Sequence, residues 1–188
     1  MKALQVIENM GNAARQNRLI AAQYFLDNPS EFLFLLQKTF DPDYKYHHKA
    51  AWVLEFVLDK NFDLLLPYLD FFTSNISKLQ NDSAIRPIAK ICEWIAIKYS
   101  HKNSKQLQTI LSQKHITAII ETGFDWLIGD YKVATKAYTM HTLYMLGKLP
   151  DAPKWIHQEL RTVIAERMEV ESAAFKSRGR KILALLKE

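Results

Sequence analysis

The chain has 188 residues, of which 48% are hydrophobic and 12% aromatic, and its formal net charge is +5. This length suits one domain with a sizeable core, and the composition excludes an intrinsically disordered chain. Its 5 Gly and 6 Pro are too few for a loop-rich or all-β protein. The mildly basic balance permits an acidic partner without requiring one.

The single Cys92 excludes an internal disulfide and a thiolate metal cluster, so we expect a reducing compartment and a cytoplasmic protein. No run approaches the roughly 18 uncharged residues of a membrane span, because Asp63 and Asp70 interrupt the most apolar stretch. Glu8 lies inside the only apolar stretch of the N-terminal segment, which therefore lacks a signal-peptide core. We expect no membrane association.

Helical periodicity dominates the first half of the chain, and no useful β alternation occurs. We expect helices over residues 2–10 and 12–26, the second ending before the Asn-Pro pair at 28–29. Ser30 is the predicted N-cap of the next helix, and the Asp-Pro-Asp sequence at 41–43 breaks the chain again.

In the second half, a helix opening at residue 61 or 62 is expected to bend at Pro67. Residues 102–104 form the most linker-like stretch, and the helical pattern over 105–128 is expected to break near Ser112. The Gly-Asp pair at 129–130 predicts a helix end and the next N-cap together. A turn over 147–153 then precedes a final partner helix over 154–168.

One amphipathic segment recurs in altered form at residues 43–59, 82–98, 130–147 and 171–186, each time after another amphipathic segment. Such self-similarity predicts stacked helical pairs, because no pair can bury its apolar face alone. We expect an all-α chain forming one domain over 1–188. Its predicted architecture is a right-handed α-α superhelix of about four pairs plus N-terminal helices, ending in a polar cap.

Alignment of the recurring segments gives columns of equivalent positions. Small residues, expected where neighbouring helices approach, form the first column: Ala51, Ala89 and Ala137. Apolar residues form the second, which predicts a buried, unreactive Cys92: Leu54, Cys92 and Met140. The third column carries titratable groups: Glu55, Glu93 and His141.

Residues 82–89 (Asp-Ser-Ala-Ile-Arg-Pro-Ile-Ala) resemble the second helix of a HEAT repeat, in which Asp is followed by Val/Ile-Arg and then Ala. Residues 130–137 are similar without the Arg. Nearly the whole chain also resembles a small Bacteroidetes family of HEAT-like (armadillo-type) proteins, through residues 49–56, 86–93 and 172–176. Some members are labelled adenylosuccinate lyase, but this sequence lacks the Ser-Ser-x-Met-Pro-x-Lys-x-Asn loop of that lyase family.

The titratable column has two interpretations. Stacked repeats would place its members about 10 Å apart, and two carboxylates with an imidazole can act as general acid and base. We favour a structural ladder in which Arg86 reaches Glu55 on the neighbouring helix and compensates a half-buried charge. The 6 histidines form no metal-binding motif and the glycines no phosphate loop, so we expect neither metal nor cofactor.

Basic and aromatic residues interleave on the recurring segments and form what we call the basic row: Lys45, Lys49, Trp52, Arg86, Lys90, Trp94, Lys132, Lys136, Tyr138, Lys176, Arg178, Arg180 and Lys181. On an inner curve, such a row can follow a phosphate backbone and stack bases. HEAT-like DNA glycosylases use such a groove, and the resemblance to them covers architecture and size only. The favoured interpretation is that the aromatic rings fill gaps between repeats while the lysines form a solvated face.

We therefore expect a non-enzymatic scaffold that recognises a protein or peptide through its inner surface. The alternative is a nucleic-acid-binding protein, including a DNA-glycosylase-like one, and a third hypothesis is an enzyme that uses the titratable column. The candidate binding residues are His48, Trp52, Glu55, Arg86, Lys90, Glu93, Trp94, Lys136, Tyr138 and His141.

Overall fold

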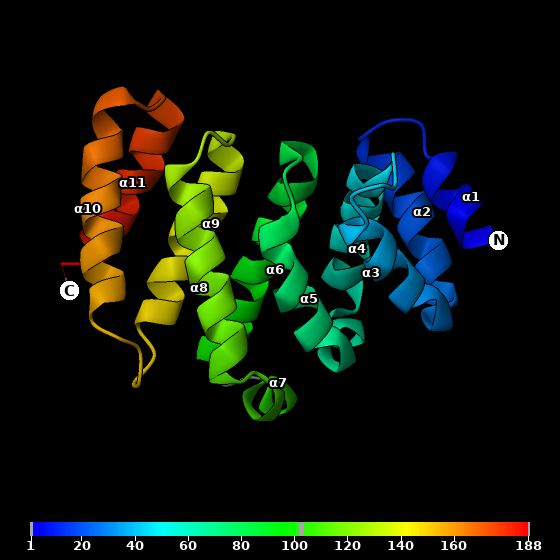
Figure 1. Cartoon of the computed structure of the whole chain (residues 1–188), viewed down its shortest axis with the longest axis horizontal. Helices are drawn as coiled ribbons and strands as arrows, with labels where there is room; N and C mark the ends of the chain where they lie inside the picture. The colour runs from blue at the N-terminus through cyan, green and yellow to red at the C-terminus, as the bar shows by residue number, and fades with distance from the viewer. Residues whose placement is uncertain (1, 102–103, 188) are drawn as a thin grey trace. The chain divides into compact units, whose positions relative to one another are not determined.

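A computed structural model of the chain describes residues 2–101 and 104–187 (Figure 1). Within these ranges all regular secondary structure is helical and no strand occurs, which confirms the all-α class. Among the described residues, no helix is long and apolar enough to cross a membrane. Internal contacts divide the chain into two compact units, Met1–Ile91 and Cys92–Glu188, and the division falls inside one helix. The expectation of one domain over 1–188 stays a prediction.

The first unit is built around α4, which packs against both α2 and α3. Its α-helices are α1 (Lys2–Glu8), α2 (Arg15–Asp27), α3 (Phe32–Phe40), α4 (His47–Lys60), α5 (Leu69–Asn75) and the first half of α6 (Asp82–Ser100). Three 3-10 helices connect them: Pro29–Glu31, Phe62–Tyr68 and Ile76–Lys78. Large apolar side chains such as Phe25, Leu35 and Leu54 are completely buried and hold these helices together.

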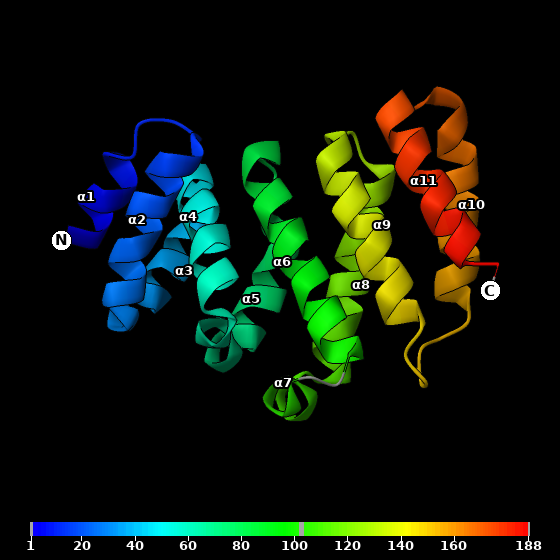
Figure 2. The ribbon, with the colours of Figure 1, turned by 180° about the vertical axis from the view of Figure 1, so that it is seen from behind.

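The second unit is built around α9, which packs against α8, α10 and α11. Its helices are the remainder of α6, α7 (Lys105–Ile110), α8 (Gln113–Ile128), α9 (Val133–Gly147), α10 (Trp155–Val170) and α11 (Ala173–Leu185). The front and back views show α8 and α10 on one face of this unit and α9 and α11 on the other (Figures 1 and 2). The third and fourth recurring segments therefore share a face.

Two predictions about the first unit are wrong at the level of helix ends. Ser30 is not an N-cap, because Pro29–Glu31 form a 3-10 turn and α3 begins at Phe32. The first recurring segment becomes helical only at His47, since the Asp41 carboxylate accepts a hydrogen bond from the Asp43 N–H and holds a turn. The helix predicted to open at residue 61 or 62 does open at Phe62, as a 3-10 helix that contains Pro67 and ends at Tyr68, and α5 follows it from Leu69.

The second unit follows the predicted boundaries more closely. The break near Ser112 is present, and Ser112 forms a capping box with His115 at the start of α8. Gly129 ends α8 as predicted, but Lys132, and not Asp130, is the N-cap position of α9. Of the predicted linker, residues 102–103 lie outside the described residues, while the hydroxyl of Ser104 accepts a hydrogen bond from the N–H of Leu107 and caps α7.

Burial along the aligned columns agrees with the repeat pattern except at one position. Every member of the apolar column is buried: Leu54, Cys92 and Met140. Cys92 is buried as predicted, and burial raises the pKa of its thiol far above the ordinary value. Ala51 and Ala89 are buried, whereas Ala137 is half-buried and lines a cavity.

Gly147, the last residue of α9, allows α10 to approach closely. A Cβ atom there would lie 2.3 Å from Cδ2 of His157. The His157 ring cannot easily move away, because its Nε2 lies 2.9 Å from the carbonyl oxygen of Tyr144 and its ring is stacked on the Tyr144 ring at 5.7 Å.

We expect Gly147→Ala to lower the free energy of unfolding by about 1–3 kcal/mol, because the added methyl group overpacks this contact. In a His157→Ala background the same change should be neutral or stabilising, since alanine is favoured over glycine in a helix by about 1 kcal/mol. Urea unfolding of the four proteins measures both effects. An equal loss in both backgrounds would contradict the clash.

Candidate functional site

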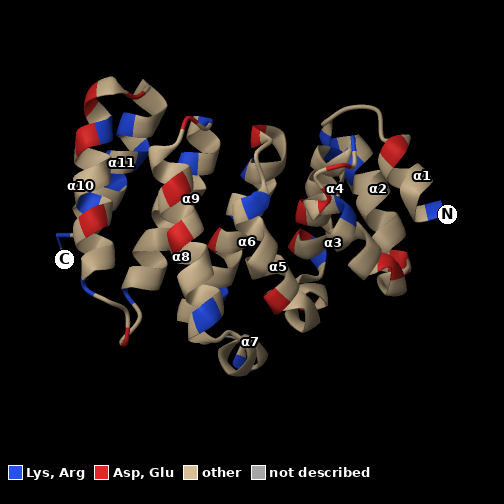
Figure 3. Cartoon of the chain, viewed as in Figure 1, with Lys and Arg blue, Asp and Glu red and all other residues tan. Residues whose placement is uncertain are grey.

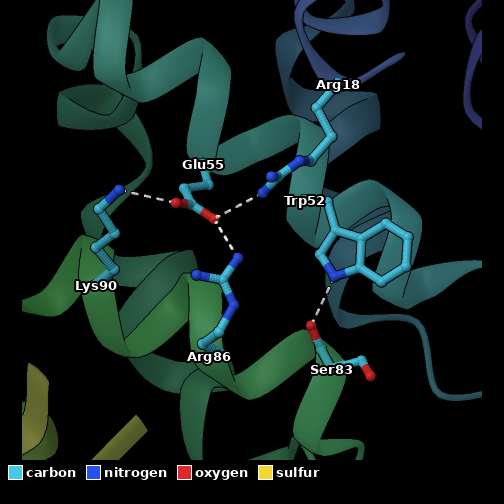
Figure 4. A network of polar contacts seen from close by, with 6 residues as sticks. All are labelled: Arg18, Trp52, Glu55, Ser83, Arg86 and Lys90. Carbon is cyan, nitrogen blue, oxygen red and sulfur yellow. Dashed lines mark hydrogen bonds and ion pairs between the residues drawn. The ribbon is translucent and has the colours of Figure 1, made fainter. Parts of the chain in front are cut away.

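A buried carboxylate in the first unit is surrounded by three cations (Figure 4). Glu55 of α4 is 3% exposed. Its Oε2 lies 2.9 Å from Nη2 of Arg86, and its Oε1 lies 2.9 Å from Nζ of Lys90. Arg18 of α2 adds a longer ion pair to Oε2 at 4.0 Å. The predicted Arg86–Glu55 pair is present.

These contacts join three helices at one point. Arg86 and Lys90 stand one turn apart on α6, so both side chains leave the same face of that helix. Desolvation lowers the pKa of Arg18, while Glu55 acts in the opposite direction, and the guanidinium carbon lies 4.5 Å from the centre of the Phe56 ring. Because both oxygens of Glu55 accept from cations, the arrangement favours the structural interpretation of this residue over a general base.

Other candidate residues of the first unit also have internal partners. Trp52 donates its Nε1–H to the carbonyl oxygen of Ser83 at 2.9 Å, and the His48 ring meets the Trp52 ring edge-on at 5.1 Å. Lys49 donates from Nζ to the carbonyl oxygens of Glu8 and Met10 at the end of α1. These polar groups connect helices within the unit.

In the second unit, Glu93 of α6 and His141 of α9 form a pair. Oε1 of Glu93 lies 2.8 Å from Nδ1 of His141, and the two side chains are 16% and 34% exposed. The His141 ring is stacked on the Tyr144 ring at 6.4 Å. The sequence column therefore yields a carboxylate–imidazole pair here, while Glu55 is occupied by its own cations.

The Glu93–His141 pair opens into a cavity of about 480 Å³, which we call the α9–α11 groove. Small side chains create the hollow: Ala134, Ala137 and Ala174. Larger apolar side chains flank it: Val133, Ile182 and Leu185. Its polar groups are Glu93, Tyr138, His141, Arg178 and Lys181. Three of the predicted binding residues thus meet in one cavity, together with two cations of the basic row that were not among the candidate binding residues.

Lys136 requires a correction. We expected it on an accessible binding face, but it is 2% exposed. Its Nζ forms an ion pair with Oε1 of Glu171 and lies 5.9 Å from the centre of the Phe175 ring. A buried ammonium group needs such a partner, so Lys136 connects α9 to the start of α11 and cannot contact a ligand.

The remaining candidate, Trp94, is half-buried on α6. Sequence reasoning missed Arg18, because nothing in its local pattern signals a partner on another helix. Arg178 and Lys181 belong to the basic row, and the helical spacing of the last segment could have placed them on one face. Within the described ranges, no group of three His, Cys, Asp or Glu residues could hold a metal ion.

Comparison with known proteins gives no relative, since no family model, curated protein or solved structure matches this chain. The resemblance to HEAT repeats therefore stays a prediction from the sequence motifs.

Replacing Glu55 by Ala should lower the free energy of unfolding by about 3–5 kcal/mol, because three cations then lose their counter-charge in a half-buried site. Glu121→Ala on α8 is the control, since that side chain is exposed and its loss should cost within about 0.5 kcal/mol. Chemical denaturation of both variants measures the two changes in the free energy of unfolding. Equally small losses in the two variants would refute the conclusion that Glu55 stabilises the contact between α2, α4 and α6.

Stability should also depend on pH through the first turn of α4. Burial lowers the pKa of His47 and of His48 below the ordinary value of 6.5. The unfolded chain then binds protons more readily, so the stabilisation is complete above 6.5 and is lost as the pH falls through that value toward the folded-state pKa. A His47→Gln/His48→Gln variant should lose less stability between about pH 7.5 and 5.5 than the unchanged chain. Urea unfolding of both proteins at the two pH values measures these losses. If the prediction is wrong, both proteins will lose the same free energy of unfolding between the two pH values.

Proposed function

We propose that the chain is a HEAT-like helical-repeat scaffold without catalytic activity, and that it binds a protein or peptide through the α9–α11 groove. The observation that carries the proposal is the position of this groove. It is lined by α6, α9 and α11, which are the second, third and fourth recurring segments. Hollows with apolar walls and few polar groups are typical of peptide-binding sites between helices.

The internal use of the basic row favours a protein ligand over a nucleic acid. Four of its cations already have partners in the fold: Lys49, Arg86, Lys90 and Lys136. Phosphate binding depends on the number of cations that can neutralise the backbone, and these four are occupied. Trp52 is likewise held by its hydrogen bond to the carbonyl oxygen of Ser83.

A bulky side chain in the hollow should abolish peptide binding. Ala134→Trp fills the α9–α11 groove, whereas Thr117→Trp places the same uncharged group on the exposed surface of α8. Peptides selected from a random library on the unchanged chain should bind Thr117→Trp equally and Ala134→Trp at least about tenfold more weakly, a loss of about 1.4 kcal/mol. Fluorescence anisotropy measures the affinities, and circular dichroism checks that both variants are folded.

Equal binding to all three proteins would overturn the groove as the binding site. Single-stranded DNA serves as the competing ligand. Affinity for DNA that falls steeply with added salt and is unchanged in Ala134→Trp would support the nucleic-acid alternative instead.

A further inference from the structure

We infer that the α9–α11 groove binds an acidic amphipathic helix of a partner protein, with apolar side chains in the hollow and carboxylates on Arg178 and Lys181. The inference rests on the proposed function and names the chemical class of its ligand.

All charged side chains of α11 are positive. Residues 172–187 contain Lys and Arg but neither Asp nor Glu, and Figure 3 shows these basic positions along α11. Arg178 and Lys181 line the groove and are exposed. Among the described residues, neither side chain forms an ion pair or a hydrogen bond. Other exposed cations in the described ranges also lack a protein partner, and Arg178 and Lys181 differ from them by lining the groove, where their charges can meet a ligand.

The lining residues of α11 lie along one stripe of the helix. Ala174, Arg178, Lys181 and Leu185 follow each other at spacings of three and four residues, which places them on one face. At a rise of 1.5 Å per residue the stripe is about 16 Å long, or roughly three helical turns. Its apolar ends and cationic middle match a ligand helix whose acidic residues lie beside its apolar anchors.

A carboxylate inside the groove would repel such a ligand unless its charge were compensated. Of the residues that line the cavity, Glu93 is the acid, and its Oε1 is held 2.8 Å from Nδ1 of His141. Against this one carboxylate stand the two cations of Arg178 and Lys181, so the formal charge of the lining is +1 (2 − 1, with His141 neutral). The field in the groove is therefore positive, which favours an acidic segment over a basic one.

Two matched probes test the ligand class. One is a fluorescein-labelled helical peptide of Leu, Ala and Glu, with Leu at i, i+3 and i+4 spacings, and the other has Lys in place of every Glu. We expect the unchanged chain to bind the acidic probe at least about tenfold more tightly than the basic one, with a preference that weakens as salt is added. Arg178→Glu/Lys181→Glu should reverse the preference.

Lys105→Glu/Lys154→Glu is the control for net charge, because both lysines are exposed and lie outside the groove. This variant should keep the preference for the acidic probe. If the unchanged chain binds both probes equally and Ala134→Trp blocks both, the acidic ligand is refuted while the groove stands. If Ala134→Trp binds the acidic probe as well as the unchanged chain does, the proposed function fails with it. Binding of both probes weaker than about 1 mM overturns the inference.

Discussion

Compensation of the Glu55 charge is the constraint on which the first unit depends. A carboxylate that is 3% exposed loses its hydration on folding, and only nearby cations and hydrogen-bond donors can replace that hydration. Arg86 and Lys90 supply it from α6, and Arg18 supplies a weaker contribution from α2. Because these donors come from α2 and α6 and the acceptor from α4, one side chain fixes the registers of all three helices within the unit. Apolar contacts alone specify register less sharply, since they are not directional.

In the other unit, a second buried charge is likewise compensated by an oppositely charged side chain. The ammonium group of Lys136 is removed from water on α9 and meets the Glu171 carboxylate just before α11. Together with the Glu93–His141 pair, it connects the helices that line the α9–α11 groove. The groove is thus bordered by polar contacts that fix the positions of α6, α9 and α11 within this unit. A partner segment would meet side chains that are already in place.

Periodicity in the sequence predicted which segments are helical, but local polar groups decided where several helices begin. The break between α7 and α8 follows from Ser112, whose capping role is visible in its own neighbourhood. The late start of α4 depends on an Asp41–Asp43 hydrogen bond that competes with the helix. Spatial partners were predictable only where the repeat alignment related them, as for Glu55 and Arg86. Lys136 was misplaced because its acid lies 35 residues away in a different aligned position.

Three stacked rings extend from the groove toward α10. His141 lines the cavity, and its ring is stacked on the Tyr144 ring. The other neighbour of the Tyr144 ring is the His157 ring, which lies beside Gly147. Interplanar angles of 14° at both steps keep the rings nearly parallel. The His141 imidazole, held in this way, would lose little rotamer freedom if a ligand bound in the groove. The conformational entropy of this side chain is therefore lost when the chain folds, and binding at this wall of the groove would cost little more of it.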